Sequence, residues 1–146
     1  MERHEFLAKL GIGTLAACGM GCGLVSCSKS GSPGPSGSNN NAPAAGTTVT
    51  LDLNSSIKNV GDQTVSNGII IVRLASGNTV SSFTAVQVAC THEGNSINYN
   101  NSQGIFICPA HGSEFSKTGA LLQGPATRSL KEYTVVVSGT TLTVTV

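Results

Sequence analysis

The sequence predicts an all-β domain made of antiparallel strands, arranged as a sandwich or a barrel. From about residue 47 onward, short runs rich in Val, Ile and Thr are separated by clusters of Gly, Asn and Ser, which is typical of strands joined by turns. No segment of this region has a convincing helical period. Residues 137–141 (Val-Ser-Gly-Thr-Thr) carry a hairpin signal. Many short strands with turns between them indicate an antiparallel sandwich or barrel.

Six segments are strand candidates. Residues 48–53 alternate apolar and polar side chains with a period of two, and residues 68–74 form a continuous β-branched run. The remaining candidates are short segments with Gly, Asn and Ser between them: residues 82–88, 104–107, 133–137 and 141–146. The mature domain is small, so a cofactor that ties its loops together would help to stabilise it.

The N-terminal part of the chain is expected to direct export. Residues 1–9 are charged and residues 10–25 are apolar and Gly-rich, which is typical of a secretory signal and too short for a convincing membrane span. The stretch ends in Leu-Val-Ser-Cys27, which resembles the bacterial lipobox, whose Cys is diacylated after cleavage just before it. Leu-Ala-Ala-Cys18 also fits that pattern, and an uncleaved anchor is a third reading.

The export route is left open by the first residues. Residues 3–9 (Arg-His-Glu-Phe-Leu-Ala-Lys) resemble a twin-arginine signal in which His4 replaces the second Arg, so that route and the general secretory route both remain. Residues 28–47 are rich in Ser, Gly, Pro and Asn and have nothing to bury, which predicts a flexible linker. We therefore expect a signal peptide at 1–26, a lipid-acceptor Cys27 with a linker at 27–47, and a domain at 48–146.

Charge and hydropathy argue against nucleic acid as a partner and against a membrane span within the domain. The formal net charge is +1 and there is no basic run, which argues against nucleic acid. Past residue 46 no stretch is apolar for long enough to cross a bilayer. Four charged residues near the start of the domain are expected at the solvated surface; they are Asp52, Lys58, Asp62 and Arg73.

Two matched half-motifs hold the chemistry-bearing residues of the domain. They are Cys90-Thr-His92-Glu-Gly and Cys108-Pro-Ala-His111-Gly-Ser. Each follows a strand candidate, so both are expected on loops. From Cys27 onward the chain has no other His, and its only other Cys is Cys27 itself. Chance is therefore a poor explanation for the pattern.

Three kinds of site compete for these residues. Cys90 and Cys108 would suit a disulfide in an exported domain. Two Cys and two His would also suit zinc, but zinc ligand pairs are usually spaced two to four residues apart, and Cys90 and His92 have one residue between them. That single-residue gap becomes easy if the two residues bind different iron atoms.

The half-motifs resemble the signature of the Rieske iron–sulfur family, C-x-H followed by C-P-x-H-G-S. The likeness continues to the end of the chain, from about residue 83 to residue 146. It implies a [2Fe–2S] cluster, one per chain, with Cys90 and Cys108 on one iron and His92 and His111 on the other. It also implies a sandwich of stacked antiparallel sheets with a small cluster-binding subdomain inserted between strands. Carried over, the segment Gly124-Pro125-Ala126 is the loop that shields the cluster.

Departures from the family pattern suggest how the cluster is tuned. Respiratory members of the cytochrome bc type have two further cysteines that bridge the loops; here those positions are Asn95 and Ala110, so the chain looks more like Rieske ferredoxins and oxygenase domains. Ser113 matches a serine whose hydroxyl bonds a bridging sulfide. Phe115 stands where high-potential members have a tyrosine donor. Three remaining polar residues are expected to serve only the loops; they are Thr91, Glu93 and Ser116.

The function implied is one-electron transfer, by a membrane-tethered carrier or by the electron-transfer subunit of a larger oxidoreductase. A catalytic pocket would need acid–base groups, and the domain sequence shows neither clustered carboxylates nor a further His. The chain is therefore not expected to be an enzyme by itself. The partner is expected to be a redox protein, cytochrome c-like or a larger oxidoreductase, on the periplasmic side of a bacterial membrane or at the cell surface. The alternative is a structural or binding β-domain with a Cys90–Cys108 disulfide or a zinc site.

Overall fold

The computed structural model describes residues 42–146. The expected signal peptide, both candidate lipid-acceptor residues, Cys18 and Cys27, and most of the linker lie outside the described residues. The predicted domain at 48–146 lies wholly inside them.

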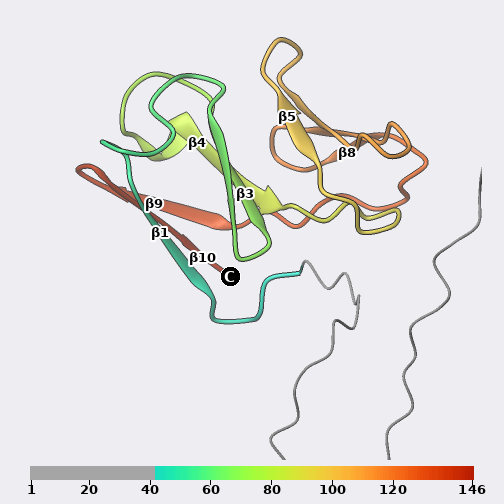
Figure 1. The fold of residues 1–146 in the computed structure, drawn as a ribbon, viewed down its shortest axis with the longest axis horizontal. Helices are drawn as coiled ribbons and strands as arrows, with labels where there is room; N and C mark the ends of the chain where they lie inside the picture. Colours follow the sequence, from blue (N-terminus) through green and yellow to red (C-terminus); the bar gives the residue numbers. More distant parts are fainter. Residues whose placement is uncertain (1–41) are drawn as a thin grey trace, which may run out of the picture. The chain divides into compact units, whose positions relative to one another are not determined.

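Three antiparallel sheets make up the described part of the chain (Figure 1). The first sheet has the order β1 (Thr48–Asp52), β10 (Thr141–Thr145), β9 (Thr134–Ser138). The second has the order β2 (Gln63–Ser66), β3 (Ile69–Arg73), β4 (Phe83–Gln87). The third has the order β5 (Asn98–Asn100), β6 (Ile105–Ile107), β7 (Glu114–Ser116), β8 (Leu121–Gln123). A single turn of 3₁₀ helix at Val80–Ser82 is the only helical segment between residues 42 and 146, so the predicted all-β class is confirmed.

Strands β3 and β4 of the second sheet are buried on both faces. Ile69 and Ile71 of β3 pack into a core shared with the first sheet, which includes Leu142. Ile70 and Val72 point the other way, into a core shared with the third sheet. Because neighbouring side chains of a strand alternate between faces, a strand covered on both sides needs apolar residues at every position. This is why residues 69–72 form a continuous apolar run.

The third sheet is an insertion between β4 and β9. The chain leaves β4, forms β5 to β8, and returns to β4 just before β9 begins. On return, the Tyr133 N–H donates to the Ala85 carbonyl at 2.9 Å, and the Gln87 N–H donates to the Lys131 carbonyl at 2.8 Å. Both ends of the insertion are thus fixed on one strand of the second sheet, and the small subdomain that was predicted between strands is present.

Arg73 is not at the surface, so that expectation is wrong. Its side chain is 5% exposed and lies at the end of β3, where two loops present acceptors. Nε donates to the Ile57 carbonyl at 2.6 Å, Nη1 to the Gly77 carbonyl at 2.7 Å and Nη2 to Asn78 Oδ1 at 3.1 Å. The guanidinium also lies over the Phe83 ring, 4.6 Å from its centroid. A planar guanidinium with several N–H donors can satisfy all these groups at once, which is why a charge is tolerated there.

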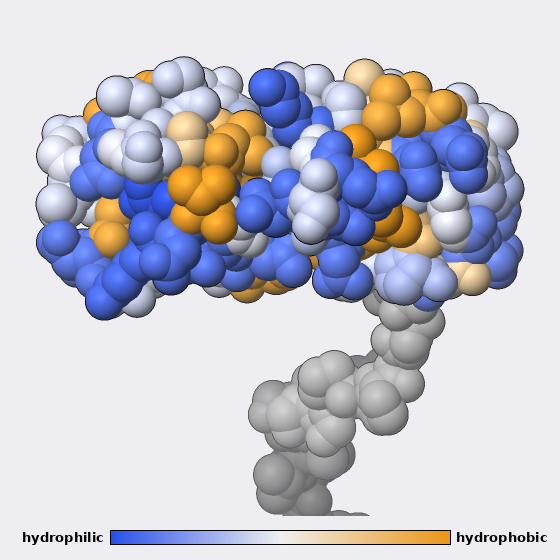
Figure 2. All heavy atoms as spheres, turned by 90° about the horizontal axis from the view of Figure 1, so that it is seen from above, coloured by the Kyte–Doolittle hydropathy of each residue, from blue (hydrophilic) through white to orange (hydrophobic). Residues whose placement is uncertain are grey.

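The surface of the described residues is mixed. Asp52 and Lys58 are exposed as expected, and Asp62 is half-buried. Apolar residues appear in separate patches among hydrophilic ones on the face that Figure 2 presents. No helix within residues 42–146 is long and apolar enough to cross a membrane.

Candidate metal centre

The two half-motifs form loops of the same backbone geometry. In the first, the Cys90 N–H donates to the Asn95 carbonyl and the Gly94 N–H donates back to the Cys90 carbonyl, both at 2.8 Å. In the second, the Cys108 N–H donates to the Ser113 carbonyl at 2.8 Å, and the Gly112 N–H donates to the Cys108 carbonyl at 2.9 Å. Each loop closes through a glycine of positive φ, 76° at Gly94 and 75° at Gly112, a conformation that favours glycine.

Within each loop, the thiol and the imidazole face different environments. Cys90 and Cys108 are 3% and 1% exposed and belong to the core between the second and third sheets. The side chains of His92 and His111 are 30% and 45% exposed. The two imidazole rings lie 4.9 Å apart between centroids and are perpendicular to one another. The fold therefore brings the four predicted ligands together, with sulfur on the inside and nitrogen on the outside.

The two thiols are close neighbours and are not joined by a disulfide. Burial raises the pKa of the Cys90 thiol above its ordinary value, and the adjacent Cys108 raises it further. The backbone N–H of His92 and the hydroxyl of Ser113 oppose these effects, because each donates a hydrogen bond to the Cys90 sulfur. The site thus has two donors aimed at one sulfur.

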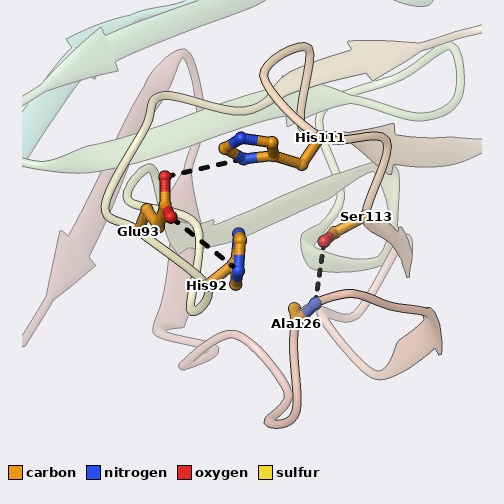
Figure 3. A network of polar contacts seen from close by, with 5 residues as sticks. All are labelled: His92, Glu93, His111, Ser113 and Ala126. Atoms are coloured by element: carbon orange, nitrogen blue, oxygen red, sulfur yellow. Dashed lines mark hydrogen bonds and ion pairs between the residues drawn. The ribbon is translucent and has the colours of Figure 1, made fainter.

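A third segment of chain lies against both ligand loops. Ser113 is completely buried, and its Oγ accepts a hydrogen bond from the Ala126 N–H at 3.0 Å (Figure 3). Thr91 Oγ1 donates to the Arg128 carbonyl at 2.5 Å, so Thr91 does more than serve its own loop. The segment expected to shield a cluster, Gly124-Pro125-Ala126, is therefore hydrogen-bonded to the second loop through Ala126. Two residues further on, Arg128 is hydrogen-bonded to the first loop. Gly124 and Pro125 are exposed and Ala126 is buried.

The remaining residues singled out in the sequence lie in different surroundings. Phe115 is fully buried in the same core as both thiols and pairs with Phe106 across β6 and β7. Asn95 and Ala110 are exposed and carry no sulfur, so no bridge joins the loops there. Ser116 serves its own turn, as expected, because its Oγ accepts from the N–H of Ala120 at 3.1 Å.

Glu93 is the site residue that the sequence reasoning missed. One carboxylate oxygen lies 4.0 Å from Nε2 of His92, and the other lies 3.6 Å from Nδ1 of His111. Its position directly after His92 was the available signal, but spacing alone does not say which way a loop side chain points.

These residues fit a two-iron cluster better than a single ion. A [2Fe–2S] centre with mixed ligands needs two thiolates on one iron and two imidazoles on the other. The separation of two buried thiols from two exposed imidazoles matches that division, and the hydrogen bonds to Cys90 suit a sulfur that carries negative charge.

Comparison with known proteins gives the family. Residues 48–134 match the Rieske [2Fe-2S] domain. The cytochrome b6-f complex iron-sulfur subunit of Trichodesmium erythraeum (strain IMS101) is 30% identical over 137 residues, covering 89% of this chain and 76% of the relative. The crystal structure of the cyanobacterial plasma membrane Rieske protein PetC3 from Synechocystis PCC 6803 is 33% identical with a TM-score of 0.52, covering 65% of this chain and 92% of that one.

A more distant structure shows the fold alone. The ferredoxin of carbazole 1,9a-dioxygenase from Nocardioides aromaticivorans IC177 is 22% identical with a TM-score of 0.51, covering 70% of this chain and 98% of that one. Since the family match spans more than half of the residues and the curated relative is matched over most of its length, the chain belongs to the Rieske [2Fe–2S] family, whose domain binds a [2Fe–2S] cluster.

Proposed function

We propose that the chain transfers one electron at a time through a [2Fe–2S] cluster held by Cys90, Cys108, His92 and His111. The two thiolates hold the inner iron and the two imidazoles hold the outer iron. The observation that carries this assignment is the placement of buried thiols and exposed imidazoles on two loops of the same geometry. The cluster, when bound, supplies the one-electron chemistry.

The residues around the site have separate tasks in this proposal. The core between the second and third sheets keeps water from the thiolates. The His92 N–H and the Ser113 hydroxyl stabilise negative charge on sulfur, which favours the reduced state. The segment Gly124-Pro125-Ala126 shields the cluster, held in place by the bond between Ala126 and Ser113. The exposed edges of His92 and His111 are where the electron enters and leaves.

The chain is proposed to act with a larger oxidoreductase. Relatives are named as cytochrome b6-f iron-sulfur subunits, which supports electron transfer within or to such a complex. Among residues 42–146, His92, Glu93 and His111 form the cluster of potential metal-binding side chains, and its two imidazoles are already assigned to the outer iron. We therefore assign the domain the role of a carrier or an electron-transfer subunit.

The proposed location is the outer side of a bacterial membrane. Cys27 would carry the lipid and residues 28–47 would let the domain reach its partner. Three acyl chains on a processed Cys27 would hold the protein firmly, whereas one chain binds a membrane only weakly.

The test of the ligand set is substitution with iron and acid-labile sulfide measured in each variant. Cys90→Ser and Cys108→Ser are expected to abolish the cluster, because the thiolate is lost and the loop loosens. His92→Ala and His111→Ala are expected to abolish it or leave an altered centre. Thr118→Ala, in an exposed turn, is the matched control and should keep full iron content. Any of the four ligand variants that keeps a normal Rieske spectrum removes that residue from the set.

A further inference from the structure

The side chain of Glu93 contacts the imidazoles of both ligand loops. It follows His92 in the first loop, whereas His111 belongs to the second, and its carboxylate lies to one side of the two imidazoles with one oxygen toward each (Figure 3). The carboxylate oxygens lie 4.0 Å from His92 Nε2 and 3.6 Å from His111 Nδ1. Within residues 42–146 these are the contacts of 4.0 Å or less between a carboxylate oxygen and a basic side-chain nitrogen, and Glu93 makes both of them.

We propose that Glu93 is a positioning residue that sets the redox behaviour of the centre by placing one negative charge against both outer ligands. The inference rests on the proposed function, because it concerns the same imidazoles. From the spacing of the ligands alone, Glu93 was expected to be an ordinary loop residue.

The direction of the effect follows from charge. Reduction adds one negative charge to the centre, and a carboxylate within about 4 Å of both imidazoles opposes that addition. A carboxylate beside a metal-bound imidazole tunes the metal through its charge. Glu93 lies beside both rings, at Nε2 of His92 and at Nδ1 of His111. Glu93 therefore favours the oxidised state and lowers the midpoint potential.

The size of the effect is limited by solvent. The Glu93 side chain is 56% exposed, so water and salt screen its charge. We expect a shift of about three- to tenfold in the equilibrium constant for electron exchange, where tenfold corresponds to about 59 mV for one electron. The same exposure makes the effect sensitive to ionic strength, because the screening length falls from roughly 30 Å at 0.01 M salt to about 3 Å at 1 M.

The test measures midpoint potentials of the full chain, loaded with its cluster, at low and high salt. Glu93→Gln keeps the size of the side chain and removes the charge, so it should raise the potential by the stated amount. Glu93→Lys should raise it further. Glu132→Gln is the matched control, because Glu132 is an exposed carboxylate bridged to β4 and makes no ion-pair contact with either imidazole within the described residues. Its equilibrium constant for electron exchange should stay within twofold of that of the parent chain, a difference of less than about 18 mV in potential.

The difference between Glu93→Gln and the parent should shrink at 1 M salt. Equal potentials for the two at low salt, with normal Rieske spectra in both, overturn the inference and leave the proposed function standing. A parent chain without a Rieske spectrum overturns both. If Glu93→Gln loads no cluster, the parent and Glu93→Lys are compared at low and high salt. A parent potential that does not rise with salt overturns the inference. A parent potential that rises with salt, while that of Glu93→Lys does not, supports it.

Discussion

Replacing Ser113 with alanine removes two hydrogen bonds from the centre of the site. Ser113 is completely buried, its Oγ accepts from the Ala126 N–H at 3.0 Å, and its hydroxyl donates to the Cys90 sulfur. The first bond holds the segment that contains Ala126 against the second ligand loop. The second bond stabilises negative charge on a ligand atom. One substitution therefore changes both the stability of the domain and its potential.

The two effects have different sizes. The Ala126 N–H would lose its acceptor in a buried position, which costs about 1–3 kcal/mol of folding free energy. A hydrogen bond to a charged group contributes about 1.5–3 kcal/mol, but only its difference between the two redox states changes the potential. Since about 1.4 kcal/mol corresponds to about 59 mV for one electron, Ser113→Ala should lower the potential by some tens of millivolts.

Protein-film voltammetry on the cluster-loaded chain measures the potential, and urea unfolding of the same sample measures the stability. Ser116→Ala is the control, because Ser116 lies in the next turn and its Oγ accepts from Thr118 and Ala120 instead of contacting a thiol. The control should lose a little stability and keep its potential. A Ser113→Ala potential equal to that of the parent would mean that the hydroxyl does not point at the cluster, and the reasoning would fail at that residue.

Three further changes test other parts of the account. Phe115→Tyr should raise the potential by some tens of millivolts by voltammetry, since it adds a donor in the core that holds both thiols; an unchanged or lower potential contradicts this. Arg73→Lys should lower the unfolding free energy in urea by about 1.5–3 kcal/mol with the potential unmoved, because one ammonium cannot replace the guanidinium's three contacts. Cys27→Ser should move the protein out of the membrane fraction or leave it unprocessed, and release by Cys18→Ser instead would place the lipid on the other cysteine.

The sequence predicted the longer strands that bury apolar side chains and missed β2, which buries none. The run at 69–72 identified β3 because both of its faces are covered. β2 was not predicted, because it has one apolar residue, Val65, which is 56% exposed, and so shows no alternating pattern. The Asn67–Gly68 pair was a hairpin signal for it: Asn67 has a φ of 49° and Gly68 a φ of 78°, the positive values that a two-residue turn requires.

The three-residue strands β5, β7 and β8 are too short to show a periodic pattern in the sequence. A strand of three residues shows too little alternation of apolar and polar side chains to be recognised. It forms because neighbouring strands pair with it in the folded sheet. Arg73 was misplaced for a related reason: its acceptors come from loops whose approach to the end of β3 no pattern reveals.

The candidate ligands were the most predictable part of the site. Two Cys and two His in matched half-motifs leave few arrangements open, and the fold brings all four together. The residues that surround them were less predictable. The contact of Glu93 with both imidazoles and the bond from Thr91 to Arg128 depend on how two loops and a third segment meet in space.

The central claim is that these four side chains hold a [2Fe–2S] cluster, and one spectrum tests it most directly. The purified chain, reduced with dithionite, is examined by electron paramagnetic resonance, and its iron and acid-labile sulfide are measured on the same sample. The account predicts a Rieske-type signal with two irons and two sulfides per chain, which disappears in Cys90→Ser. A colourless protein with no signal, holding one zinc ion or a Cys90–Cys108 disulfide, would contradict it.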